Sequence, residues 1–198
     1  MRNVRIATLY RSAARLLCIA ALPLGSGCAS NAPLSANEQH ALAQPPHDVA
    51  ALVDELQPGV ADYIREAERD GSKDGHPLDA QQLELARAVG VMEPERVVVV
   101  YTHRFPVASD AALAAQLRTR FGIGGAADGG LTMGHTIFIA GKYAGARWLL
   151  AHELTHVAQF ERLGVERFAH DYLTQMLIVG YARAPLEREA AANEPLGK

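Results

Sequence analysis

Apolar residues recur at helical spacing along much of the chain and define its predicted helices. The first covers residues 49–68, and Pro58-Gly59 within it predicts a break or a kink. A second helix is predicted over 78–89, with Asp79 as its N-cap, and a short third over 110–121. The apolar side chains that share one face of the first helix are Val53, Leu56, Val60 and Ile64.

Two stretches rich in β-branched residues predict strands. Residues 96–102 form a continuous apolar run, which is typical of a strand buried on both faces. Residues 132–139 predict a second strand, in which His135 is expected to be structural or exposed rather than a ligand. The glycine-rich stretch 122–130 predicts a flexible loop and lacks phosphate-binding spacing, so no nucleotide site is expected.

The last third of the chain reads as helical. Residues 146–162 contain neither proline nor glycine and carry apolar side chains at i, i+4 and i+7. Further helices are predicted over 166–181 and 184–193. Because the strands are confined to the middle of the chain, the expected fold class is α+β, with a small sheet packed on helices.

The amino-terminal residues predict export. Four arginines precede an apolar run at residues 16–24, and no acidic residue occurs before position 28. This order predicts a secretory signal over residues 1–27, since the run is shorter than the about 20 residues of a membrane span. Cys28 follows small residues and resembles the lipidated cysteine of a bacterial lipobox, which would anchor the protein to a membrane. The alternative is ordinary signal cleavage nearby, with Cys28 incidental.

The composition, 49% hydrophobic and 21% charged in 198 residues, is that of one globular domain. Residues 28–48 contain three prolines and predict a flexible tether, so the domain is expected to cover 49–198. Removing the four signal arginines changes the net charge from −3 to −7, which disfavours nucleic acid as a partner. At most Cys28 remains after processing, which excludes an internal disulfide and a cysteine metal site. No sequence feature indicates an oligomeric state.

The most specific motif lies within the predicted helix 146–162, where His152, Glu153 and His156 form the pattern H-E-x-x-H. Residues four apart lie on one face of a helix, so the two imidazoles can hold one Zn²⁺. Glu153 is rotated by about 100° and can act as an acid–base group on a water at the metal. The structural alternative is a buried amphipathic helix with two hydrogen-bonded histidines.

Two histidines do not complete a catalytic zinc site, which usually has three protein ligands. His170 follows His156 by 14 residues, and no glycine turn stands at the spacing that a third histidine ligand requires. A glutamate from a later helix is therefore expected. The downstream candidates are Glu161, Glu166, His170, Asp171, Glu187, Glu189 and Glu194, of which the first two lie too near to fold back.

Two family resemblances refine this expectation. Leu186-Glu187-Arg188-Glu189-Ala190-Ala191, taken with the histidine motif, resembles the gluzincin zinc peptidases, in which a helix supplies a glutamate ligand. The resemblance implies Glu187 as the third ligand, with Glu189 as the alternative. Gluzincins often carry an aspartate at the position of Ala191, where it orients a zinc histidine. The stretches 131–138 and 149–159 resemble the bacterial extracellular contractile injection system core domain.

These features predict a zincin-like, zinc-dependent peptidase in the bacterial cell envelope, acting on a peptide or protein. Glu153 is the expected general base. Donors to the transition state are expected from Tyr172, Tyr181 or His170, because no histidine or tyrosine follows Glu187. The alternative is a non-enzymatic envelope lipoprotein whose zinc site is structural or vestigial and which binds a partner.

Overall fold

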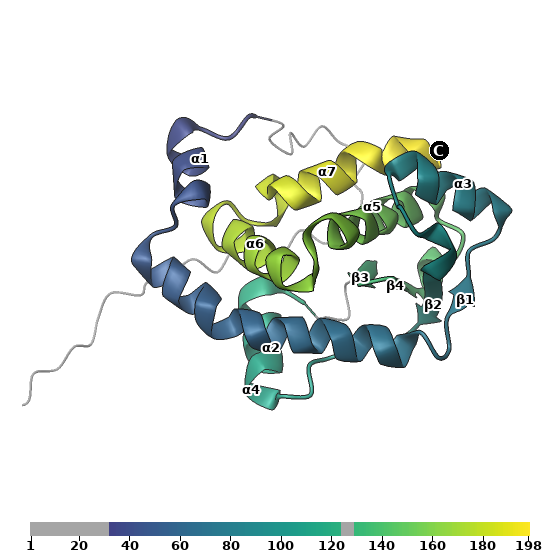
Figure 1. The fold of residues 1–198 in the computed structure, drawn as a ribbon, viewed down its shortest axis with the longest axis horizontal. Helices are drawn as coiled ribbons and strands as arrows, with labels where there is room; N and C mark the ends of the chain where they lie inside the picture. Colours follow the sequence, from purple (N-terminus) through teal and green to yellow (C-terminus); the bar gives the residue numbers. More distant parts are fainter. Residues whose placement is uncertain (1–31, 124–128) are drawn as a thin grey trace, which may run out of the picture.

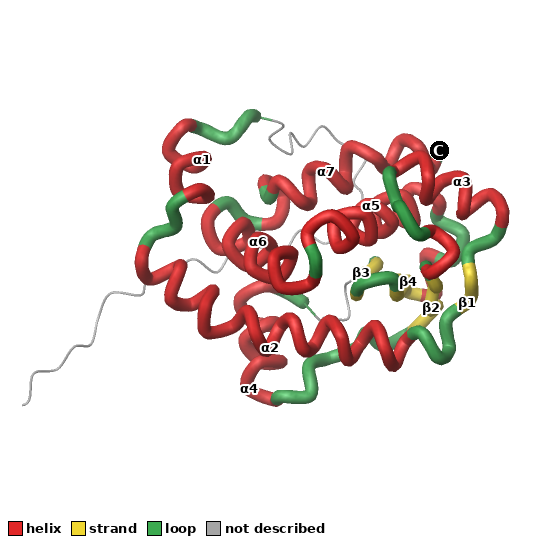
Figure 2. Tube along the Cα trace, viewed as in Figure 1, coloured by secondary structure: helices red, strands yellow, loops and turns green. Residues whose placement is uncertain are grey.

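Residues 32–123 and 129–198 of the computed structural model are described, and they form an α+β fold in which helices predominate (Figures 1 and 2). The expected signal and lipidation site, 1–27 and Cys28, lie outside these residues. Within the described ranges, no helix is long and apolar enough to cross a bilayer. The α-helices are α1 (Ala36–Ala43), α2 (His47–Gly71), α3 (Ala80–Val89), α4 (Ala111–Gln116), α5 (Arg147–Leu163), α6 (Val165–Ile178) and α7 (Pro185–Asn193).

The sheet has four strands in the order β1-β2-β4-β3. The strands are β1 (His76–Pro77), β2 (Val98–Thr102), β3 (Gly130–Met133) and β4 (Thr136–Ala140). β2 and β4 are parallel, with Val99 opposite Ile137, while β1 and β3 run antiparallel to their neighbours. β3 is therefore an edge strand, and it contacts α5.

Alternate residues of β4 point into two apolar cores, one on each face of the sheet. Phe138 belongs to a core that includes buried residues of α2 and α6. Ile137 and Ile139 belong to a second core, built with α3 and α5. This period of two is the geometry of a strand, and it places α5 directly against the sheet, with α2 on the other side (Figure 1).

The stretch 132–139, expected as one strand, is two strands joined by a turn at Gly134 and His135. Gly134 has φ +59°, and a Cβ there would lie 2.3 Å from the carboxylate of Glu68. Only glycine fits this turn, because the left-handed backbone and the close carboxylate both disfavour a side chain. The apolar run on both sides hides the turn from a periodicity argument.

Two further expectations are corrected. α2 is continuous from His47 to Gly71, so the break expected at Pro58 is wrong, while the alternative, a kink, stays a prediction. Its buried face packs on α6, and this packing outweighs the hydrogen bond that proline cannot donate. β2 is only partly buried: Val99 is 2% exposed, whereas Tyr101, two residues further along the same face, is 42% exposed.

The expected tether also contains ordered structure. Ser35 caps α1 in a capping box with Glu38, and Glu38 forms an ion pair with Arg183, which lies in a short 3-10 helix (Tyr181–Arg183) before α7. The Arg183 guanidinium, aided by Ser35, lowers the pKa of Glu38 to about 2. The folded body therefore begins at α1, before the expected boundary at residue 49.

Candidate metal centre

α5 carries the H-E-x-x-H motif in a buried part of the fold. Every residue from Leu149 to Phe160 is buried; the apolar ones up to Ala158 belong to the core shared with the sheet and α3, whereas Phe160 stacks on Phe168 of α6. His152 and His156 lie on adjacent turns, with their ring centroids 5.0 Å apart. The helix ends at Gly164, whose φ of +76° favours glycine.

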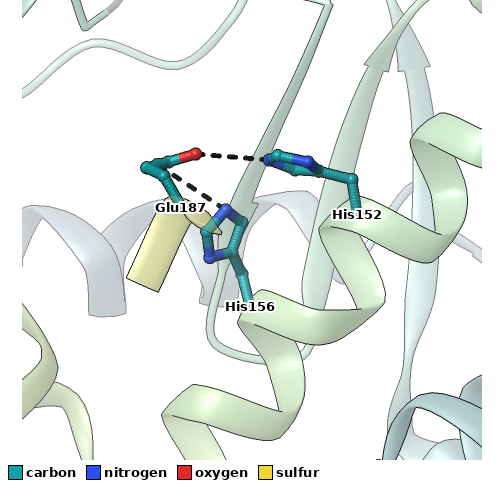
Figure 3. A group of neighbouring side chains, drawn as sticks. All are labelled: His152, His156 and Glu187. Atoms are coloured by element: carbon teal, nitrogen blue, oxygen red, sulfur yellow. Dashed lines mark ion pairs between the residues drawn. The ribbon is translucent and has the colours of Figure 1, made fainter. Parts of the chain in front are cut away.

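α7 brings Glu187 to the two imidazoles, as Figure 3 shows. One carboxylate oxygen, Oε2, lies 3.3 Å from Nε2 of His152, and the other, Oε1, lies 3.7 Å from Nε2 of His156. One potential ligand atom from each of the three buried residues lies within 4.8 Å of the others. α7 begins at Pro185, a residue that is well suited to the first turn of a helix. Glu187 lies in the same first turn.

Hydrogen bonds hold this first turn against the neighbouring helices. The side chain of Gln159 donates from Nε2 to the carbonyl of Leu186 at 2.9 Å. The backbone N–H of Leu186 donates to Oε1 of Gln175 in α6 at 2.9 Å. The residue before Glu187 is thus fixed from both sides, which limits the movement of the carboxylate.

The same glutamine fixes the hydrogen on His156. Because Nε2 of Gln159 donates to Leu186 and to Oε2 of Glu189, its Oε1 must be the atom that faces Nδ1 of His156, at 2.8 Å. Nδ1 of His156 therefore carries the hydrogen and donates it. In the neutral ring this leaves the lone pair of Nε2 directed at Glu187, as in a metal-ligating histidine.

His152 has the same arrangement with a carboxylate in place of the amide. Oε1 of Glu194 lies 3.1 Å from Nδ1 of His152. A carboxylate only accepts, so Nδ1 donates and Nε2 faces Glu187. Glu194 begins the 3-10 helix Glu194–Gly197, which packs on α5.

The electrostatics of the cluster favour positive charge. Burial lowers the pKa of His152, but hydrogen bonds to Glu187 and Glu194 outweigh it and raise the pKa to about 10. Burial likewise lowers the pKa of His156, and the charge of Glu187 raises it above its ordinary value. Burial raises the pKa of Glu187, but the two histidines hold it well below its usual range.

The residues fit a divalent cation. Oε2 of Glu187 is buried, and Nε2 of His152 lies 3.3 Å from it. Two imidazole nitrogens and one carboxylate form the His₂Glu donor set of catalytic zinc sites. A single cation would neutralise the carboxylate and accept both Nε2 lone pairs. Without a cation, each Nε2 must carry a proton to interact favourably with the carboxylate.

Glu153 lies beside this cluster and is held by the edge strand. The hydroxyl of Thr132 in β3 donates to Oε2 of Glu153 at 2.7 Å, and both residues are buried. A Cβ at Gly130 would lie 2.3 Å from Oε1 of the same carboxylate. The glycine and the threonine of β3 together define the position of Glu153.

The other candidates fall in three places. Glu189 pairs with Arg162 and Gln159 and stays away from the two Nε2 atoms. Tyr172 and Tyr181 lie close to Glu187: burial, followed by the charge of Glu187, raises the pKa of each phenol, although Tyr181 is 52% exposed as a residue. His170 pairs with its neighbour Asp171 and is not brought to the cluster.

His135 belongs to a separate group. Its ring lies between Oε1 of Glu68 (3.4 Å) and Oε1 of Glu161 (3.1 Å), with Glu93 at 4.0 Å. The hydrogen bond to Glu68 raises the pKa of His135 despite its partial burial. Glu161 already accepts two backbone N–H groups, of Met92 and Glu93, so this histidine connects α2, α5 and the β3–β4 turn as a structural contact.

Sequence reasoning did not identify Gln159, Thr132 or the role of Glu194. Gln159 follows His156 by three residues on the same helix, and this spacing is a usable signal for a side-chain pair. Thr132 and Glu194 reach the site from other elements, and no local pattern indicates that. Glu194 is one of the ligand candidates of the sequence, and the structure places it at Nδ1 of His152 instead, on the far side of the ring from Glu187.

A family model described as the eCIS core domain matches residues 125–164. Over this stretch the chain is similar to that family, and the match contains β3, β4 and the histidine motif of α5. It covers about a fifth of the chain and ends before Glu187. No curated protein and no solved structure matches the chain.

Proposed function

We propose that the protein is a zinc-dependent peptidase in which His152, His156 and Glu187 are the zinc ligands and Glu153 is the general base. The observation that carries the proposal is the convergence of three buried donors from two helices, with a buried carboxylate whose oxygens face the two imidazole nitrogens. We further propose that the chain is exported and held at the bacterial envelope through Cys28.

Bound zinc would supply Lewis acidity, which polarises a carbonyl and makes a water molecule more acidic. Glu153 accepts a proton from that water and returns it to the leaving amine. Thr132 fixes the carboxylate for both transfers by donating to its Oε2.

Donation to the transition state falls to the tyrosines next to Glu187. Tyr172 and Tyr181 keep their hydroxyl protons at neutral pH, because burial and the charge of Glu187 raise the pKa of both phenols. A neutral phenol can donate to an oxygen that becomes negative. Of the two, Tyr181 is the more exposed and is therefore easier for a substrate to reach.

The edge strand β3 is the part of the sheet next to Glu153. An extended peptide can add to such an edge through backbone hydrogen bonds. A peptide on β3 would bring its carbonyls near Glu153, which agrees with peptide or protein as the class of substrate.

The test combines zinc content with turnover. The purified protein is expected to bind one zinc ion and to cleave members of a fluorogenic peptide library, with cleavage stopped by a chelator and restored by zinc. Glu153→Gln should retain zinc and lose cleavage, and Glu55→Gln, which changes an exposed glutamate of α2, should match the wild type. Equal cleavage by wild type and Glu153→Gln would refute the role of Glu153.

The burial of the site supports a second candidate function. His152, Glu153, His156 and Glu187 are each 8% exposed or less, which also suits a structural zinc ion in a protein that binds a partner. In that case zinc should raise the unfolding temperature while no library peptide is cleaved. Zinc-dependent turnover that is lost in Glu153→Gln would exclude this candidate.

A further inference from the structure

The residue that orients His152 is in an unexpected position. Ala191, where gluzincins often have an orienting aspartate, is exposed on α7 and has no polar side chain. The group at Nδ1 of His152 is instead the carboxylate of Glu194, three residues further along, at 3.1 Å. Ala191 lies within α7, which ends at Asn193, whereas Glu194 is the first residue of the 3-10 helix that follows.

This 3-10 helix is fixed against α5 on both sides of Glu194. Before it, Nδ2 of Asn193 donates to the hydroxyl of Thr155 in α5 at 3.1 Å. After it, Gly197 packs in backbone contact with the start of α5, where a Cβ would lie 2.3 Å from the carbonyl oxygen of Arg147. The segment therefore lies along α5 and holds Glu194 over His152.

A carboxylate at Nδ1 has a specific effect on a histidine ligand. It fixes the ring tautomer and orientation, and it makes Nε2 a stronger base toward a cation. The Glu194 side chain is 33% exposed, whereas His152 is 10% exposed, so the interaction is only partly screened by solvent. His156 receives a neutral amide from Gln159 instead, so only His152 has a charged partner behind it.

We propose that Glu194 is the positioning residue for His152 in the zinc site and substitutes for the aspartate that Ala191 replaces. This inference rests on the proposed function, because it assigns Glu194 a role toward the same cation. Glu194 does not contact the cation. It acts through Nδ1 of His152, and Gly197 allows the close packing that brings it there.

The test measures zinc affinity of the full chain by competition with a chelating dye. Glu194→Ala is expected to bind zinc about 10–100-fold more weakly than the wild type, the usual effect of losing an outer partner of a ligand. Glu194→Gln keeps an acceptor without the charge and is expected to lose less. Glu55→Gln is the matched control and should retain wild-type affinity.

Two measurements separate positioning from general destabilisation. Chemical unfolding of the zinc-free variants should remain cooperative, as in the wild type. In the zinc-loaded proteins, the Nδ1–H resonance of His152 should be protected from exchange in the wild type and lose this protection in Glu194→Ala. Reduced zinc affinity without loss of this protection would overturn the inference, because the effect would not pass through Nδ1.

The outcomes also distinguish this inference from the proposed function. Wild-type zinc binding with equally tight binding by both Glu194 variants would overturn the role of Glu194 and leave the zinc site intact. A wild-type chain that binds no zinc would overturn both. Zinc binding that Glu194→Ala weakens, without turnover by any variant, would support the positioning role while refuting the peptidase.

Discussion

Gly130 gives the sharpest test of how the edge strand controls Glu153. The substitution Gly130→Ala adds one methyl group to β3, at a point 2.3 Å from Oε1, 2.6 Å from Cδ and 2.8 Å from Cγ of Glu153. All three atoms belong to one flexible side chain, so the clash is relieved by moving that side chain rather than the backbone. None of the three atoms nearest to the methyl group belongs to the proposed zinc ligands.

The required movement sets the expected size of the effect. Ordinary van der Waals contact begins at 3.4 Å, so Oε1 must retreat by about 1 Å. A misplacement of about 1 Å in a catalytic constellation can cost about 100-fold in rate. We therefore expect kcat/KM to fall about 100-fold, equivalent to about 2.7 kcal/mol of transition-state stabilisation. Zinc content should stay at the wild-type value.

The assay is turnover of one peptide identified in the library, measured together with bound zinc and thermal unfolding. Gly129→Ala is the control one residue away, where the atoms nearest to a Cβ belong to Tyr143, at 3.3 Å, and Leu149, at 3.6 Å, and not to Glu153. Wild-type turnover by Gly130→Ala would refute the reasoning, because the carboxylate would then tolerate displacement. Loss of zinc from Gly130→Ala would also contradict it.

Three further changes test the surrounding contacts. Thr132→Val removes a hydrogen bond to a charged group, worth about 1.5–3 kcal/mol, and should lower kcat/KM about tenfold or more, whereas Thr132→Ser should stay near wild type; steady-state kinetics decides. Glu187→Gln keeps the shape of the side chain but loses its charge. Dye competition should show a loss of zinc affinity larger than the about 10–100-fold that is typical for an outer partner of a ligand. An unchanged affinity would show that Glu187 is not a ligand. His135→Gln should cost stability that depends on pH. The pKa of His135 is raised in the folded state, chiefly by Glu68 and then Glu161, so its contribution is fully present below pH 6.5 and is lost as the pH rises through the folded-state pKa. Urea unfolding of zinc-free wild type and variant should differ by about 1 kcal/mol at pH 6 and converge at high pH; a constant difference would refute the charge argument.

Local sequence patterns predicted the elements whose structure depends on local residues. Asp79 was expected to cap a helix, and it does so in a capping box with Gln82. The spacing of His152 and His156 predicted two rings on adjacent turns, and they lie there. Both results depend only on helix geometry, which a few neighbouring residues determine.

The errors come from interactions between distant segments. The helix through Pro58 is stabilised by α6, more than 100 residues away in the sequence, and no local propensity includes that packing. The turn at Gly134 is set by a carboxylate of α2, Glu68, so the strand-like residues around it gave no signal.

The candidate site shows the same division. Glu187 is predicted from a family resemblance and not from helical spacing. It follows His156 by 31 positions with α6 in between, and helical spacing relates only residues within a few turns of one helix. Gln159 and Glu194 both serve the histidines through Nδ1, but only the folded chain shows which side chain reaches which ring.

The ion pair between Glu38 and Arg183 limits how far the folded domain could move from a membrane. If Cys28 is acylated, the start of α1 at Ala36 follows it by eight positions, whereas the flexible tether expected from the sequence extends the distance to about twenty positions. A fully extended chain spans at most about 3.5 Å per residue, so the segment between Cys28 and α1 can reach about 28 Å, instead of about 70 Å for the longer tether. If the domain is the proposed peptidase, it would then act within one bilayer thickness of the lipid surface and cleave only proteins that come close to that surface.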